Sequence, residues 1–101
     1  MFEVGHRSRG KYLTLLVAPS KTDQLRLGIV ASKQLGDAVR RNLAKRLIRE
    51  VFRRTPQEPE QPGVDIVVIP RRELFDATYP NLEQDYRTLV RRSTERLLRR
   101  G

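Results

Sequence analysis

The stretch "SKQLGDAVRRNLAKRLIREVFRR", residues 32–54, decides the fold, because its apolar residues recur at the spacing of one amphipathic helix. Two neighbouring rows step through it four residues at a time. They consist of Val39, Leu43, Leu47 and Val51, and of Ala44, Ile48 and Phe52. Asp37, after Gly36, suits the N-cap position, because its carboxylate can accept a hydrogen bond from a free amide of the first turn. We therefore expect one helix that starts after Asp37 and ends near Arg54.

The polar residues of this helix form a cationic sector beside the apolar rows. At about 100° per residue, a sector of roughly 140° contains Arg41, Asn42, Lys45, Arg46, Arg49 and Arg53. Glu50 is expected to lie outside it. Like charges on one side of a helix repel each other, and phosphates would offset this repulsion through the fork of arginine. The pattern favours a nucleic-acid surface, although a solvated face on a basic protein would give the same sector.

Composition limits the classes of protein to which the chain can belong. A chain of 101 residues with 21 lysines and arginines against 12 aspartates and glutamates predicts one small domain with a polyanionic partner, for which nucleic acid is favoured, and we expect residues 1–101 to form a single RNA-binding domain. Without cysteine there is no disulfide framework and no thiolate metal site. No apolar run reaches the ~20 residues that cross a bilayer, so we expect a cytoplasmic protein with no membrane partner. We also expect no small-molecule substrate.

Strands are expected on both sides of the helix. "KYLTLLVAPS" (11–20) and "LRLGIVASK" (25–33) are rich in β-favouring residues, and the short polar segment between them predicts an antiparallel hairpin. A third short strand is expected within Val4 to Arg9. The continuous run "VDIVVIP" (64–70) predicts a strand covered on both faces, in which Asp65 needs an edge or a partner.

A second long helix is expected after Thr78, which suits the N-cap position and leaves Pro80 in the first turn. Its inward residues would be Leu82, Tyr86, Leu89, Val90, Ser93 and Leu97. The segment "TPQEPEQPG" (55–63) is expected to be an exposed loop, and "RRELFDATYP" (71–80) to contain a helical turn. The predicted order β-β-α-β-α gives an α+β domain with one small sheet covered by helices.

Residues 32–54 resemble the signature of the protein subunit of bacterial ribonuclease P, and the flanking strands and closing helix extend the resemblance over nearly the whole chain. The resemblance implies a mixed sheet of about four strands with a left-handed β-α-β crossover, similar to the ribosomal protein S5 domain 2-like fold. It implies an RNA-binding subunit of an endoribonuclease holoenzyme, in which ribonuclease P RNA, with its magnesium, cuts the 5′ leader from precursor tRNA. The residues that match the family's RNA-binding element are Lys33, Arg41, Asn42, Lys45, Arg46 and Arg49, and we add Arg40 and Arg53 from the basic sector.

The chain departs from the family pattern at several positions. Leu43 replaces the third member of the Arg-Asn-Arg element, where Arg40 could substitute, and we expect Leu43 on the apolar stripe. Gln34 replaces a frequent second lysine, and Asp37 stands where asparagine is usual. The family's N-terminal helix is expected to be largely missing, which would leave an exposed apolar strip on the sheet. The candidate residues for a leader cleft are Phe2, Tyr12 and Val30.

No catalytic site of the protein itself is expected. The only histidine is His6, and a metal-free ribonuclease needs both a base and an acid. The aspartates are scattered over different elements, so neither a metal site nor a cofactor bound by side chains is predicted. The alternative function is a ribosomal or other structural RNA-binding protein without a processing role.

Overall fold

The computed structural model describes residues 6–19, 26–55 and 64–100, with the backbone alone at residues 6, 64 and 96–100. The elements, in order, are β1 (His6–Arg9), β2 (Leu13–Pro19), β3 (Arg26–Ile29), a 3-10 helix η1 (Lys33–Leu35), α1 (Ala38–Arg54), β4 (Val64–Pro70), a 3-10 helix η2 (Arg72–Asp76) and α2 (Tyr79–Arg100). The expected third strand, the helical turn and both long helices are therefore confirmed. The expected loop at 55–63 lies outside the described residues except for Thr55.

The four strands form one mixed sheet in the order β1-β2-β4-β3. β2 runs antiparallel to both β1 and β4, whereas β3 runs parallel to β4. The expected hairpin between β2 and β3 is therefore wrong, because β4 lies between them. The physical reason is that β4 pairs along the whole of β2, from Leu13 to Pro19, whereas β3 offers only four residues for pairing.

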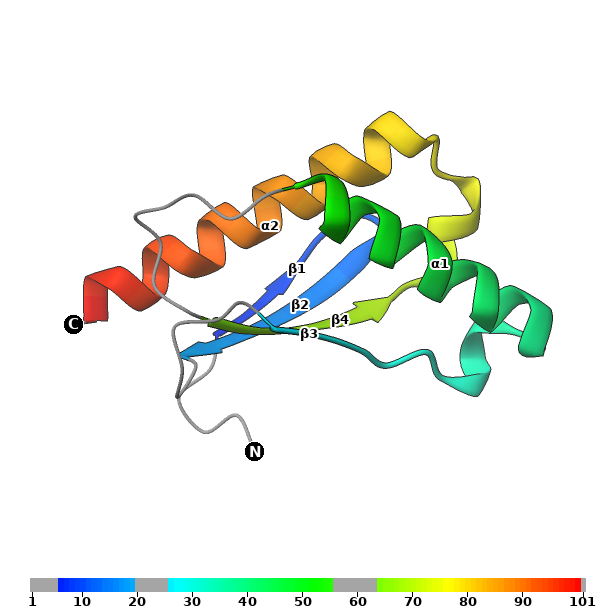
Figure 1. Cartoon of the computed structure of the whole chain (residues 1–101), viewed down its shortest axis with the longest axis horizontal. Helices are drawn as coiled ribbons and strands as arrows, with labels where there is room; N and C mark the ends of the chain where they lie inside the picture. The colour runs from blue at the N-terminus through cyan, green and yellow to red at the C-terminus, as the bar shows by residue number, and fades with distance from the viewer. Residues whose placement is uncertain (1–5, 20–25, 56–63, 101) are drawn as a thin grey trace.

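The connection from β3 through α1 to β4 has the uncommon left hand. In Figure 1 both parallel strands run to the right, α1 returns above them, and β3 lies on the viewer's side of β4. General chain rules favour the right hand in about 98% of such crossovers. The α+β fold that the family resemblance implied is confirmed.

The core lies between the sheet and the two helices, which cover the same face of the sheet (Figure 1). Its buried side chains come from every layer: Leu13, Leu15 and Val17 of β2, Ala44, Ile48 and Val51 of α1, Ile66 and Val68 of β4, and Leu82, Tyr86 and Leu89 of α2. The hydroxyls of Ser8 and Ser93 lie 2.9 Å apart in this layer and join β1 to α2.

Two residues of the first predicted apolar row are not in the core. Val39 is 76% exposed and Leu43 is 41% exposed, so the placement of Leu43 on the apolar stripe is wrong. A four-residue step advances about 40° around a helix. The row therefore drifts, so that Leu47 and Val51 reach the core side while Val39 and Leu43 turn away from it.

The opposite face of the sheet is not covered by either helix (Figure 1). Leu16, Val67 and Ile69 lie on this face and are half-buried. Among the described elements, β4 is therefore covered by helices on one face only, whereas the sequence predicted cover on both faces. A Cβ on Gly28 would contact Val67 Cγ2 at 3.7 Å, which places these two residues on the same face. Asp65 has a partner, as expected, because Arg26 donates from Nε and Nη2 to its two carboxylate oxygens at 2.8 and 2.9 Å.

Both helices begin with the predicted caps. Asp37 accepts a hydrogen bond at Oδ1 from the Arg40 amide at 3.0 Å, and Thr78 accepts one at Oγ1 from the Asn81 amide at 3.3 Å. These bonds satisfy amides that have no partner within the first helical turn. The start of α1 is therefore fixed locally by sequence.

We expect Asp37→Ala to lower the free energy of unfolding by about 1 kcal/mol, because an amide of the first turn loses its acceptor. Asp37→Asn should stay close to the parent, because asparagine caps equally well. Urea denaturation of the three proteins measures both effects. Equal losses in the two variants would show that the charge of Asp37, and not its capping bond, stabilises the helix.

Candidate nucleic-acid interface

The outward side of α1 carries a hollow of about 400 Å³, here called the α1 hollow. It is lined by Asn42, Lys45, Arg46, Arg49, Glu50 and Arg53. The structure thus brings together five of the eight residues that the sequence suggested for RNA binding. Their shared position follows from the helical spacing, because steps of three and four residues keep side chains on one side of a helix.

The charge of the α1 hollow is positive and only partly compensated. Among the residues that the structure describes, Lys45, Arg46 and Arg49 have no carboxylate partner. Cations without a carboxylate partner in the described part of the chain could form charge-assisted hydrogen bonds with an anionic group.

Glu50 lies on the wall of this hollow, contrary to the expectation that it would stay outside the basic sector. Its carboxylate receives hydrogen bonds from Arg53 Nη2 at 2.7 Å and Arg54 Nε at 2.9 Å. The bond from Arg53 holds the pKa of Glu50 below its ordinary value. The long side chain of Glu50, drawn toward Arg53 by ion pairing, explains why helical angle alone misplaced the carboxylate.

The remaining three suggested residues are not in the α1 hollow. Arg41 is half-buried, and its Nε is enclosed without a hydrogen-bond partner in the described part of the chain. Arg40 lies over the ring of Phe75, with its guanidinium carbon 5.4 Å from the ring centroid. Lys33 is exposed at the start of η1.

Arg40 is held in its place by the turn before the helix. Gly36 has a φ of 128°, and a Cβ there would lie 2.8 Å from Arg40 Cδ. Arg40 thus packs between this turn and η2. That Arg40 substitutes for the family's arginine at position 43 stays a prediction.

The three leader-cleft candidates are not brought together. Phe2 lies outside the described residues. Tyr12 is only 7% exposed and belongs to the core. Val30 is 50% exposed and donates its amide to the Val68 carbonyl at 2.9 Å, so it extends the edge of the sheet beside β4.

Two cations on the sheet face that neither helix covers, Arg7 and Arg9, were not among the residues predicted from the sequence. Ser8 of β1 bonds Ser93 of α2, so Arg7 and Arg9 point to the opposite face by strand alternation. Both are exposed, and they pair in register with Leu16 and Thr14. The alternation in "HRSR" was the signal that could have placed them.

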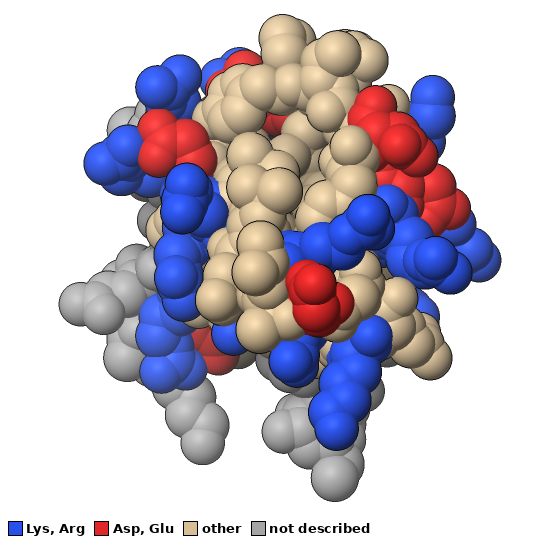
Figure 2. All heavy atoms as spheres, turned by 90° about the vertical axis from the view of Figure 1, so that its right-hand side faces the viewer, with Lys and Arg blue, Asp and Glu red and all other residues tan. Residues whose placement is uncertain are grey.

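Other kinds of site are not formed by the described part of the chain. Within residues 6–19, 26–55 and 64–100, no group of three or more His, Cys, Asp or Glu residues is close enough to hold a metal ion. No helix in these ranges is both long and apolar enough to span a membrane. Figure 2 shows Lys and Arg gathered on both sides of a strip of uncharged residues at the end of the molecule where the helices begin.

Comparison with known proteins matches residues 1–94 to the family described as Ribonuclease P. The ribonuclease P protein component of Clostridioides difficile strain 630 is 37% identical over 93 residues, which cover 92% of this chain and 82% of the relative. That of Thermotoga maritima is 42% identical over 76 residues, or 75% of this chain, and the match spans only 64% of the relative's length.

Solved structures give the same result. The RNase P protein from Thermotoga maritima superposes with a TM-score of 0.76 at 34% identity, covering 90% of this chain and 86% of the other. The RNase P protein of Staphylococcus aureus gives 0.74 at 32% identity, covering 89% and 82%. The signature helix, the sheet order and these similarities agree, and the chain belongs to the ribonuclease P protein family.

Proposed function

We propose that the chain is the protein component of a ribonuclease P holoenzyme, in which it binds the RNA subunit through the α1 hollow and supports removal of the 5′ leader from precursor tRNA. The observation that carries this proposal is the group of three unmatched cations beside Asn42 in that hollow, on the helix whose sequence contains the family signature.

The geometry suits phosphate binding. Lys45, Arg46 and Arg49 would neutralise backbone phosphates, and each arginine can donate two parallel hydrogen bonds to one phosphate. Asn42 has no charge and would bond a base edge or a ribose hydroxyl. The α1 hollow would therefore contribute mainly electrostatic affinity, with one contact that depends on RNA structure.

The uncovered face of the sheet is the proposed place of the leader. Leu16, Val67 and Ile69 offer an apolar floor, and Arg7 and Arg9 border it with positive charge. Such a floor can accept the faces of unstacked bases while the arginines hold the backbone. This proposal keeps Val30 as a leader residue but gives Tyr12 no direct contact.

Hydrolysis is assigned to the RNA. The described side chains offer cations and hydrogen-bond donors, and their carboxylates do not cluster as a metal site would require. We therefore propose that magnesium binds through the RNA, and that this chain contributes charge and substrate grip. A cytoplasmic location stays a prediction.

Reconstitution tests the proposal. We expect the protein to restore cleavage of precursor tRNA by a bacterial ribonuclease P RNA at a magnesium concentration too low for the RNA alone. Product ends are read at nucleotide resolution, and a basic ribosomal protein of similar size and charge is the control. Equal stimulation by that control would support the alternative of a general RNA-binding protein.

Glu50→Gln should strengthen RNA binding by a few-fold and steepen its salt dependence by up to about one unit, because Arg53 is released from its ion pair. Since the pKa of Glu50 is lowered from 4.5, the parent carboxylate stays ionised at pH 5. The difference between parent and variant should therefore persist from pH 7 down to pH 5. A difference that disappears by pH 5 would mean that the pKa of Glu50 is raised above its ordinary value, contrary to the effect of the Arg53 hydrogen bond.

A further inference from the structure

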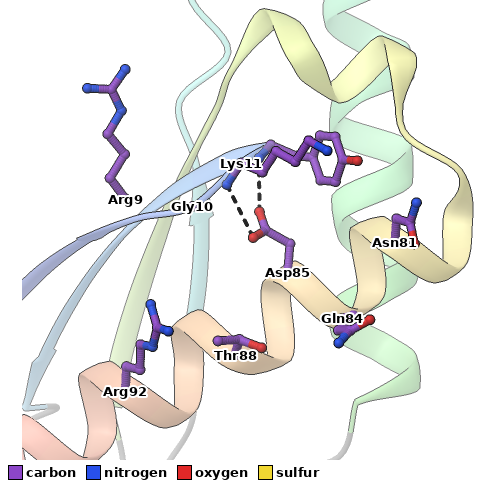
Figure 3. Close-up of a pocket in the computed structure, with 9 residues that line it drawn as sticks. Arg9, Gly10, Lys11, Asn81, Gln84, Asp85, Thr88 and Arg92 are labelled. Carbon is purple, nitrogen blue, oxygen red and sulfur yellow. Dashed lines mark hydrogen bonds between the residues drawn. The ribbon is translucent and has the colours of Figure 1, made fainter.

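A second hollow, of about 510 Å³, lies between α2 and the turn that joins β1 to β2, and is here called the α2 hollow. Asn81, Gln84, Thr88 and Arg92 follow one another along α2, and Lys11 comes from the facing turn (Figure 3). Steps of three and four residues keep the four helical side chains in one line. This line extends roughly 16 Å along the helix axis at the usual rise per residue, and the α2 hollow shares no residue with the α1 hollow.

The floor of the α2 hollow is built by a fixed carboxylate. Asp85 accepts the amide of Lys11 at Oδ1, at 3.3 Å, and that of Tyr12 at Oδ2, at 3.0 Å (Figure 3). A Cβ on Gly10 would lie 2.6 Å from Asp85 Oδ1, so only glycine lets the turn approach α2 so closely. Because these bonds hold the carboxylate against the backbone of the turn, it is not paired with the cations around it.

Positive charge and neutral donors dominate the rim. Lys11 and Arg92 are exposed, and neither forms an ion pair with any residue that the structure describes. The Lys11 ammonium lies 5.5 Å from the centroid of the Tyr12 ring. By contrast, Arg87 on another side of α2 is 3.8 Å from Glu83.

We propose that the α2 hollow binds the sugar–phosphate backbone of the ribonuclease P RNA, as a contact separate from the α1 hollow. Lys11 and Arg92 would neutralise phosphates, while Asn81, Gln84 and Thr88 would bond ribose hydroxyls and phosphate oxygens. This inference rests on the proposed function, because it takes the same RNA as the partner.

The chemistry of the hollow favours structured RNA over the single-stranded leader. Single-strand sites present aromatic faces on which unstacked bases lie. The one aromatic residue in this lining, Tyr12, is only 7% exposed. A row of hydrogen-bond donors without an accessible aromatic ring suits the sugar–phosphate backbone of RNA whose bases are already paired with other bases.

The first test compares two charge-matched double variants for binding to the ribonuclease P RNA alone. Lys11→Ala/Arg92→Ala removes two of the three cations that line the hollow and leaves Arg9, and Arg87→Ala/Arg91→Ala removes two exposed cations of α2 that line neither hollow. At slopes near 0.9 per contact, we expect the first pair to reduce the salt slope by nearly two units. When the salt concentration is raised from 50 to 200 mM, the affinity of this variant should therefore fall about tenfold less than the affinity of the parent.

The control pair should change the slope by much less, and both pairs should unfold at the temperature of the parent. Equal slope changes in the two pairs would overturn the proposal, because only the net charge would then matter. An unchanged slope in the first pair would overturn it as well.

The second test locates the RNA. Because the chain contains no cysteine, Gln84→Cys creates a single thiol at the α2 hollow, and Asn42→Cys creates one at the α1 hollow. Each thiol is loaded with an iron–EDTA group, which cleaves nearby RNA in the reconstituted complex. We expect Gln84→Cys to cut the ribonuclease P RNA at sites different from those cut by Asn42→Cys.

Each outcome of this experiment decides between the two proposals. Cutting from position 42 alone would overturn the α2 contact and leave the proposed function standing. Cutting of added precursor tRNA only, from position 84, would overturn the assignment to the ribonuclease P RNA. If neither position cuts RNA, the proposed function fails together with this inference.

Discussion

Replacing Lys45, Arg46 and Arg49 together by alanine is expected to cause the largest loss of RNA affinity among the changes considered for this protein. If each side chain neutralises one phosphate, the salt slope should fall by nearly three units. When the salt concentration is raised from 50 to 200 mM, the affinity of the variant should therefore fall roughly 40-fold less than the affinity of the parent. Filter binding to ribonuclease P RNA over a salt series measures the slope directly.

The fold should survive this triple change. The three side chains line a hollow on the outward side of α1, and surface substitutions of this kind typically shift stability by less than about 0.5 kcal/mol each. A charge-matched control replaces Arg72, Arg87 and Arg91, which are exposed and line neither hollow. If the control lowers the slope as much as the test variant, the α1 hollow is only one part of a uniformly basic surface.

Ile48→Ala is expected to lower the free energy of unfolding by about 2 to 5 kcal/mol, because it leaves a cavity where α1 meets the sheet. Ile48 is 1% exposed and belongs to the core cluster that joins α1 to β2 and β4. Small domains have only about 5 to 15 kcal/mol of total stability. For a domain of this size, the loss corresponds to a melting temperature lower by roughly 10 to 30 °C.

Leu43→Ala is the matched control on the same helix. Leu43 is 41% exposed, so its truncation opens no enclosed cavity and should cost much less. Thermal unfolding followed by circular dichroism compares the two variants. A loss at position 43 as large as that at position 48 would mean that Leu43 is buried in solution.

Local sequence signals predicted the helices well. The cap at Asp37, the end of α1 at Arg54 and the cap at Thr78 depend on neighbours within a few residues, so spacing and residue type were sufficient. The handedness of the crossover could come only from the resemblance to a known family, because general chain rules favour the opposite hand.

Long-range features were predicted less well. The position of β4 between β2 and β3 depends on pairing between segments that no local pattern connects. To predict that Leu43 is exposed, one must know on which side of α1 the sheet lies, because the sheet fixes the centre of the buried stripe. Most of the basic sector was predicted because its residues repeat on one helix. The α2 hollow instead joins a turn near residue 11 to a helix about 70 residues later, so no single stretch of sequence indicated it.

The pairing of β2 with β4 also sets the order in which the chain can fold. Partners in this central ladder are between 45 and 57 residues apart in sequence, about half the length of the chain. Closing such a loop has an entropic cost before the contacts that repay it can form, which slows folding relative to helical proteins. During synthesis, α1 is complete while its central strand β4 is still untranslated. The core therefore cannot be completed until Ile66 and Val68 of β4, and then Leu82, Tyr86 and Leu89 of α2, have left the ribosome.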